Sequence, residues 1–186
     1  IGSLDGLAIL KLVREMRADV RVVANDLLMA IEPLQSVLIP VDNINGKTTR
    51  DSLVAIDDHL KKDGALIVFP AGEVSRFGLK GVRDNRWRYG FLHFASNARA
   101  PILPICIKAR NSVLFYLLSI IVRPLSTAWL VREMYKQKKN CVNIRIGNPI
   151  LYDDYSKLEI SKLEKTKLFK RHLYQIGKGK EGILPS

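Results

Sequence analysis

The sequence contains few of the residues that build disulfide frameworks and metal centres. It has two cysteines and three histidines in 186 residues. Cys106 and Cys141 lie far apart in apolar, strand-like segments, so we expect two reduced thiols in the core of a cytosolic protein. The histidines are dispersed and show no metal-ligand spacing; they are His59, His93 and His172. We therefore expect no metal site.

Long apolar runs are also missing. No stretch reaches the roughly 18 uninterrupted apolar residues that span a bilayer, and no secretory signal opens the chain. Ile1 is not an initiator residue, so we expect further residues before it. These upstream residues leave room for an N-terminal membrane element.

Acidic residues are scarce relative to basic ones. Thirty Lys and Arg oppose eighteen Asp and Glu, which gives a formal net charge of +12. Such a surplus indicates an anionic partner, which can be a nucleic acid, an anionic bilayer, or an acidic protein or substrate. We find no RNA-recognition aromatic block, helix-turn-helix or zinc-finger spacing, so we expect no nucleic-acid partner.

Apolar strand candidates alternate with amphipathic helix candidates, and a hydrophobic content of 47% supports a folded core. Continuous apolar strands separated by helices indicate an α/β fold with a mainly parallel sheet flanked by helices. We expect an α/β core over 1–150 and a basic C-terminal helix and tail over 151–186. The expected strands are 20–25, 36–43, 65–70, 101–109 and 141–150, and the expected helices are 5–19, 48–64 and 86–99. The segment 158–182 is expected to be a cationic helix followed by a flexible end.

The principal candidate site is "FPAGEVSR", which follows an apolar strand. Pro70 ends the strand because it cannot donate to the ladder, and Gly72 lets the backbone bend close to a ligand. Ser75 and Arg76 add a hydroxyl and a forked cation, which suit a phosphate or a carboxylate. A solvated turn with surface charges explains the same residues.

Three other segments allow both a structural and a functional interpretation. Asp5 stands where an aspartate caps a helix. The segment "NINGK" at 43–47 is a second candidate anion site, although Asn-Gly is also a common turn. The apolar segment 111–125 lies between cations, which fits either a buried helix or an interfacial segment on an anionic membrane.

Together these segments resemble the glycerolipid (lysophospholipid) acyltransferase superfamily, which includes 1-acylglycerol-3-phosphate acyltransferase-like proteins. "LIVFPAGEVSR" resembles the third sequence block of that family, and "APILPICI" resembles the fourth. "IPVDNINGK" occupies the place of the second block, and "GSLDGLAIL" resembles the end of the first, a histidine followed by a short spacer and an aspartate. The residues of these blocks most resemble those of the hemolysin-like branch, whose members are linked to the acylation of lyso-aminolipids.

The sequence departs from the general family pattern at three places. Ala71 stands where the third block usually has glutamate, and Glu73 lies two places later. Asn43 stands where the second block usually has arginine, which argues against recognition of a glycerol phosphate. By the pattern of the first block, the histidine would lie just before Ile1.

The resemblance implies a membrane-associated O-acyltransferase that moves a fatty acyl group from an acyl carrier protein or coenzyme A thioester to the hydroxyl of a lyso-lipid. The upstream histidine would be the general base and Asp5 would orient it, with no cofactor beyond the thioester co-substrate and no metal. The implied location is the cytoplasmic face of the bacterial inner membrane, peripheral or anchored through the upstream residues. The implied substrate-binding residues are Asn43, Lys47, Phe69, Pro70, Gly72, Glu73, Ser75, Arg76 and Lys80.

Two alternatives stay open at this point. A glycerol-phosphate or lysophosphatidate acyltransferase would use the same sequence blocks on a different acceptor. A non-catalytic, basic lipid-binding module would have the same charge and fold without the histidine.

Overall fold

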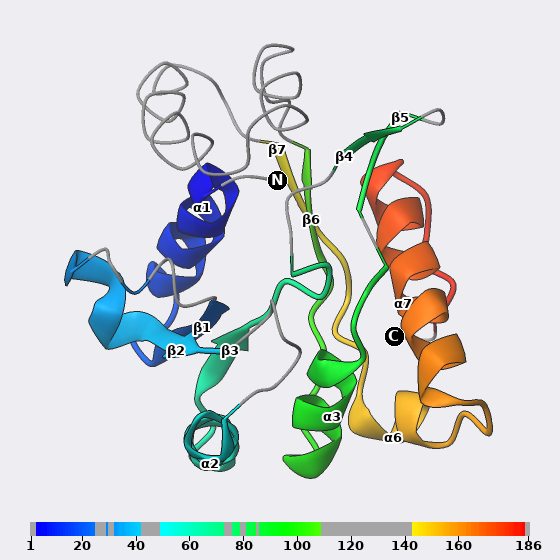
Figure 1. Ribbon diagram of the computed structural model, residues 1–186. Helices are drawn as coiled ribbons and strands as arrows, with labels where there is room; N and C mark the ends of the chain where they lie inside the picture. Colours follow the sequence, from blue (N-terminus) through cyan, green and yellow to red (C-terminus); the bar gives the residue numbers. More distant parts are fainter. Residues whose placement is uncertain are drawn as a thin grey trace.

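The computed structural model describes residues 3–24, 29, 32–41, 49–72, 76–78, 81–84, 86–108 and 143–184 (Figure 1). The side chains of residues 3–5, 76–78, 81–83 and 108 are not described. Cys141 and the apolar segment 111–125 lie outside the described residues.

A parallel sheet of three strands confirms the expected fold class. Its order is β2 (Leu38–Pro40), β1 (Val20–Ala24) and β3 (Ala65–Ile67). Val22 in the central strand is aligned with Leu38 on one side and with Ile67 on the other. The carboxyl ends of the three strands therefore lie at one edge of the sheet.

Helices cover both faces of this sheet. The apolar side chains of α1 (Ser3–Arg14) pack on one face, where Leu10 shares a hydrophobic cluster with Val20 and Val22. On the other face Ile56 of α2 (Arg50–Lys61) packs with Ile39. The alternation along β1 explains this arrangement, because successive side chains of a strand point to opposite faces.

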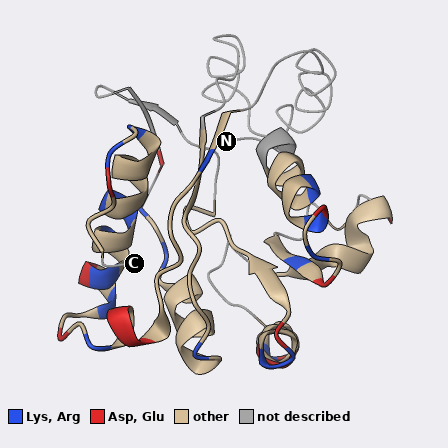
Figure 2. Cartoon of the chain, turned by 180° about the vertical axis from the view of Figure 1, so that it is seen from behind, with Lys and Arg blue, Asp and Glu red and all other residues tan. Residues whose placement is uncertain are grey.

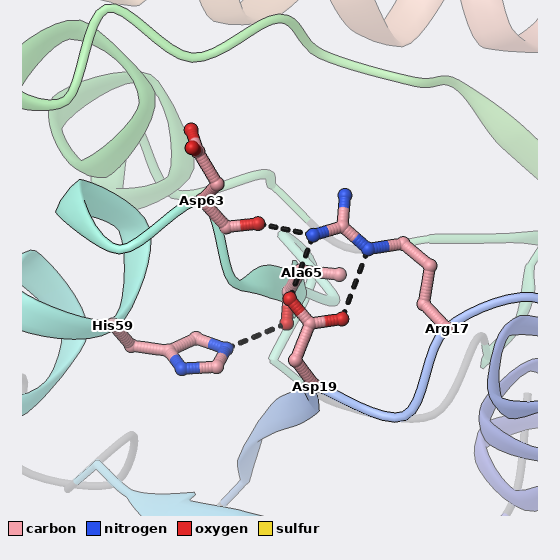
Figure 3. Close-up of polar contacts among 5 residues, drawn as sticks. All are labelled: Arg17, Asp19, His59, Asp63 and Ala65. Atoms are coloured by element: carbon pink, nitrogen blue, oxygen red, sulfur yellow. Dashed lines mark hydrogen bonds and ion pairs between the residues drawn. The ribbon is translucent and has the colours of Figure 1, made fainter.

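Polar contacts join the connections that enter β1 and β3 at the amino edge of the sheet (Figure 3). The Arg17 guanidinium donates to both Asp19 carboxylate oxygens, at 3.0 and 2.7 Å, and to the Asp63 carbonyl oxygen. The hydrogen bond from Arg17 lowers the pKa of the Asp19 carboxyl. His59 Nε2 lies 3.0 Å from the Ala65 carbonyl oxygen and donates to it. The expected helix over 5–19 thus ends at Arg14, and the residues that follow connect the two strand entries.

The other strands in the described part of the chain form two antiparallel pairs. The hairpin of β4 (Arg76–Gly78) and β5 (Gly81–Arg83) was not expected from the sequence. The expected strands at 101–109 and 141–150 contain β6 (Ile105–Lys108) and β7 (Asn143–Ile146), with a further bridge between Ile102 and Ile150. A 3₁₀ helix, η2 (Glu32–Val37), occupies the start of the expected strand 36–43.

A further hydrophobic cluster, here called the aromatic core, combines residues from the expected α/β core over 1–150 with residues from the C-terminal segment after position 150. It lies among α3 (Gly90–Asn97), α6 (Tyr152–Ser156) and α7 (Lys162–Gly177). The Tyr155 hydroxyl donates to the Ala100 carbonyl oxygen at 2.8 Å, and burial raises the pKa of Tyr155 to about 12. The buried members of the aromatic core are Trp87, Phe91, Leu92, Ala95, Ile150, Tyr155, Phe169 and Leu184.

Helix α7 begins and ends at identifiable side-chain contacts. Ser161 and Glu164 form a capping box, so the helix starts later than the expected residue 158. At the other end Arg145 Nη1 donates to the carbonyl oxygens of Ile176 and Gly177, at 3.3 and 3.2 Å. Among the described residues, no helix is long and apolar enough to cross a bilayer.

The residues after α7 fold back onto the helix. His172 is 3% exposed, and its Nδ1 accepts a hydrogen bond from the Leu184 backbone N–H at 2.9 Å. Burial lowers the pKa of His172, which favours the neutral imidazole that this bond requires. Leu184 in turn lies in the aromatic core, so the end of the described chain contributes to the core.

Candidate functional site

The candidate site lies at the carboxyl edge of the parallel sheet. The chain leaves β3 through Val68 and Phe69, next to the ends of β1 and β2. A Cβ atom on Gly6, in the first turn of α1, would lie 3.8 Å from the Phe69 ring. The backbone of Asp5, which directly precedes Gly6, is therefore close to the start of the "FPAG" segment. Figure 1 shows the N-terminal end of α1 at the same end of the molecule as β4 and β5.

The "FPAG" segment forms a tight turn. The Gly72 N–H donates to the Phe69 carbonyl oxygen at 3.0 Å. Gly72 has φ 65, a left-handed conformation that glycine adopts without the steric cost of a side chain. Pro70 has no N–H to donate, so β3 cannot continue through this position. The turn directs the chain away from the sheet toward β4.

Two hydrophobic clusters hold this turn from opposite sides. Phe69 packs with the cluster beneath α1, whereas Val68 and Ala71 pack with the aromatic core. The Arg88 N–H donates to the Pro70 carbonyl oxygen at 2.9 Å. The chain that leaves the core at Pro70 therefore returns to it at Arg88, with the β4–β5 hairpin between these residues.

The return from the hairpin is anchored on α7. The Asp84 N–H donates to Tyr174 Oη at 3.2 Å, and Lys170 Nζ donates to the Asp84 carbonyl oxygen at 2.9 Å. Trp87 Nε1 donates to Asp84 Oδ2 at 3.1 Å, and the Trp87 ring lies in the aromatic core. Both backbone polar groups of Asp84 are thus bonded to one helix. This anchor was not predicted from the sequence, where its local signal is the tryptophan that follows the charged segment.

The predicted site residues fall into two groups. The structure places the backbone of Asp5 close to Phe69, at the start of the turn that Pro70 and Gly72 form. The backbone of Arg76 begins β4, which follows this turn in the chain. The roles assigned to them stay predictions. Outside the described residues lie Asn43, Lys47, Glu73, Ser75 and Lys80.

The described part of the chain contains no group of three or more His, Cys, Asp or Glu residues that could hold a metal ion. Cys106 forms no disulfide bond within the described part of the chain. An open hollow of about 410 Å³ lies along α1, lined by Leu7, Leu10 and three charged residues. The charged residues are Lys11, Arg14 and Glu15.

Comparison with known proteins gives a consistent result. A family model described as "Acyltransferase" matches residues 1–178. Two curated relatives, named lyso-glycine lipid O-acyltransferase, come from Bacteroides thetaiotaomicron and Phocaeicola vulgatus. Each is 29% identical over 164 residues, covering 84% of this chain and 60% and 58% of the respective relative. The chain thus spans about three fifths of the length of these relatives. No solved structure matches it.

Proposed function

Because the chain belongs to this acyltransferase family, we propose that it forms the core of an enzyme that acylates the hydroxyl of a lyso-lipid. The observation that carries the proposal is the contact between the first turn of α1 and Phe69. It supports a shared site because these two segments correspond to the first and third family blocks. The names of the two curated relatives support a lyso-lipid as acceptor.

The proposed mechanism is general-base catalysis by a histidine that, by the family pattern, lies just before Ile1. Its neutral imidazole takes the proton of the acceptor hydroxyl while the hydroxyl oxygen attacks the thioester carbonyl carbon. The tetrahedral intermediate then collapses, the carbon–sulfur bond breaks, and the leaving thiolate takes the proton from the imidazolium. Asp5 holds the tautomer of the histidine and stabilises its charged form. The proposed donor is a thioester of acyl carrier protein or coenzyme A, and this chemistry uses no metal.

The proposed acceptor is a lyso-aminolipid with a headgroup carboxylate, such as a lyso-glycine lipid. Two observations support a carboxylate over a glycerol phosphate: the names of the relatives and the presence of Asn43 where the general family usually has arginine.

Purified full-length protein tests the activity directly. We expect it to form a new ester when it is given an acyl thioester and a lyso-glycine lipid. The measurement is product formation by mass spectrometry, with acyl carrier protein and coenzyme A thioesters as separate donors. Lysophosphatidate is the comparison acceptor, and faster acylation of lysophosphatidate would replace the proposed acceptor. Absence of transfer to either acceptor from both donors would contradict the proposed function.

We also propose that the protein works at the cytoplasmic face of the bacterial inner membrane. The net charge of +12 favours an anionic surface. Figure 2 shows basic residues along α1, α2 and α7, whereas the central strands carry few of them. On α1, the hollow is lined by Leu7 and Leu10 together with Lys11, Arg14 and Glu15. Cations beside apolar side chains are suited to anionic lipid.

Vesicle binding tests this location. We expect the full-length protein to bind phosphatidylglycerol vesicles at 0.1 M salt and to dissociate at 1 M, because the Debye length falls from about 10 to about 3 Å. Replacing Lys11 and Arg14 by Gln should weaken binding about 10- to 30-fold, since each surface cation contributes about 1 kcal/mol. The matched control removes the exposed Lys162 and Lys167 of α7. Equal loss in both variants would show that net charge, rather than the surface of α1, determines binding.

A further inference from the structure

Helix α7 presents a row of cations to solvent. Lys167, Arg171 and Lys178 are exposed, and they occupy positions i, i+4 and i+11 of the helix and its C-cap. This spacing places them on one side of an α-helix, and at 1.5 Å per residue the row is about 16 Å long. The opposite side carries the buried Phe169 and Ile176. The row therefore forms the solvent-facing ridge of α7, along which Figure 2 shows basic residues.

A further exposed cation, Arg86, lies beside this row. Two residues earlier, Asp84 is bonded to α7 through both of its backbone polar groups. Its N–H donates to Tyr174 Oη at 3.2 Å, and its carbonyl oxygen accepts a hydrogen bond from Lys170 Nζ at 2.9 Å. These bonds hold the chain before Arg86 against the helix. The four exposed cations are here called the α7 basic surface, which consists of Arg86, Lys167, Arg171 and Lys178.

Few acidic groups accompany these cations. Helix α7 contains one acidic residue, Glu164, whose carboxylate takes part in the capping box of the first turn. Arg86, Arg171 and Lys178 form no ion pair with another residue in the described part of the chain. Lys167 and Arg171 are like charges four residues apart, an arrangement that destabilises a helix. An acidic partner would compensate this repulsion.

The composition of the α7 basic surface distinguishes among anionic partners. Helices that bind a membrane interface insert an apolar face, whereas the exposed large hydrophobic side chains among the described residues all lie outside α7. The phosphates of coenzyme A would require cations gathered at one point, and these cations are spread along a ridge. Separate cations on a rigid helix instead complement the potential of an acidic protein surface.

We propose that the α7 basic surface is the docking site for an acidic acyl carrier protein that delivers the acyl thioester. This inference rests on the proposed function and selects one of its two donors. It assigns the surfaces of two helices to two partners, with α1 facing anionic lipid and α7 facing the carrier protein.

The docking surface is linked to the candidate site by a short path through the fold. From Asp84 on α7 the chain runs to Arg88, whose N–H donates to the Pro70 carbonyl oxygen at 2.9 Å. Pro70 follows Phe69, which lies against the first turn of α1. Figure 1 shows the C-terminal end of α7 and the N-terminal end of α1 at the same end of the molecule. The flexible prosthetic arm of a docked carrier can therefore extend toward that turn.

Donor kinetics on the full-length protein test the surface. Replacing Arg171 and Lys178 by Gln should raise the KM for an acyl carrier protein thioester about 3- to 30-fold and change kcat little, because two exposed ion pairs are lost. The difference should shrink at high salt, which screens exposed charges. An acyl pantetheine thioester, which has the reactive end of the arm without the protein, should show equal KM values for wild type and variant.

The matched control replaces Arg50 and Lys62 by Gln. Both are exposed cations of α2, and Lys62 is the C-cap of its helix as Lys178 is of α7. This control should match wild type with both donors. An equal increase in KM in the control would show that net charge, rather than the α7 basic surface, recruits the carrier.

Three other outcomes would overturn the inference. One is an unchanged KM for the carrier protein thioester in the α7 variant. The second is an equal increase with the pantetheine thioester, which would indicate general damage to the fold. The third is a loss of binding to phosphatidylglycerol vesicles as large as that of the variant without Lys11 and Arg14, which would make lipid the partner of α7.

A binding measurement separates failure of docking from failure of the proposed function. Titration calorimetry at low salt should detect binding of a bacterial holo-acyl carrier protein to the wild-type protein, whether or not any lipid is acylated. The α7 variant should bind it more weakly by the same factor as its KM rises, and the α2 control should bind it as wild type does. No binding to wild type would contradict docking even in an active enzyme. Binding without acyl transfer would leave docking in place and contradict the proposed function.

Discussion

Replacing Asp5 by Asn in the full-length protein is expected to lower kcat for acyl transfer on the order of 10³- to 10⁴-fold, as in other carboxylate–histidine pairs. The amide can neither hold the required imidazole tautomer as a carboxylate does nor stabilise the imidazolium. The measurement is the initial rate of ester formation at saturating donor and acceptor. Replacing the upstream histidine should abolish transfer.

The control for this experiment is Asp51→Asn. Asp51 is an acidic residue in the first turn of α2, and Asp5 lies in the first turn of α1. Both substitutions remove a carboxyl group from a residue in the first turn of a helix, where a negative charge typically contributes about 0.3–1 kcal/mol. Asp51→Asn should therefore cost a similar amount of stability and no activity. Normal rates in Asp5→Asn would show that Asp5 serves only its helix.

The largest expected change in stability follows from truncating Phe169. This residue is 3% exposed, and its ring centroid lies 5.6 Å from that of Phe91 and 6.0 Å from that of Tyr155. Phe169→Ala leaves a cavity where α3, α6 and α7 meet. The free energy of unfolding should fall by about 3–5 kcal/mol, from lost apolar transfer and unfilled volume. Urea unfolding followed by circular dichroism measures it.

Tyr89→Ala provides the matched aromatic control. Tyr89 is 55% exposed and begins α3 as its N-cap residue. Its truncation should change the free energy of unfolding by no more than about 0.5 kcal/mol. Phe169→Leu, which keeps an apolar side chain, should lose less stability than Phe169→Ala and remain folded for the measurement. A loss below about 1 kcal/mol in Phe169→Ala would mean that α7 is dispensable for the core.

The parallel sheet could be predicted because its signals are local. The apolar runs at 20–25 and 65–70 contain β1 and β3, and the expected helical segment 48–64 contains α2. Helix α2 ends at Lys61, whereas the expected helix runs to Gly64. Asp63 has the left-handed φ of 58, whereas Gly64 provides room for the His59 ring. Aspartate tolerates this conformation better than most residues, so the exact stop could not be read from the glycine.

The hairpin and its anchor depend on contacts that no local pattern reveals. The β4–β5 segment alternates charged residues and glycines around Phe77 and Val82, and three-residue strands are too short for a period-two signal. Asp84 and Tyr174 lie 90 positions apart in the sequence. The sequence could place the "FPAG" turn at the carboxyl edge of the sheet, but only packing determines that Gly6 lies against Phe69.

The hydrogen bond between the Arg88 N–H and the Pro70 carbonyl oxygen has a consequence for how such proteins diverge. Because the chain leaves and re-enters the core at neighbouring points, the segment between them can lengthen at small entropic cost, about 0.6 kcal/mol per doubling of a flexible loop. The hairpin is thus a replaceable insert on a constant framework. The length of this segment can therefore change while the sheet and the first turn of α1 keep their positions.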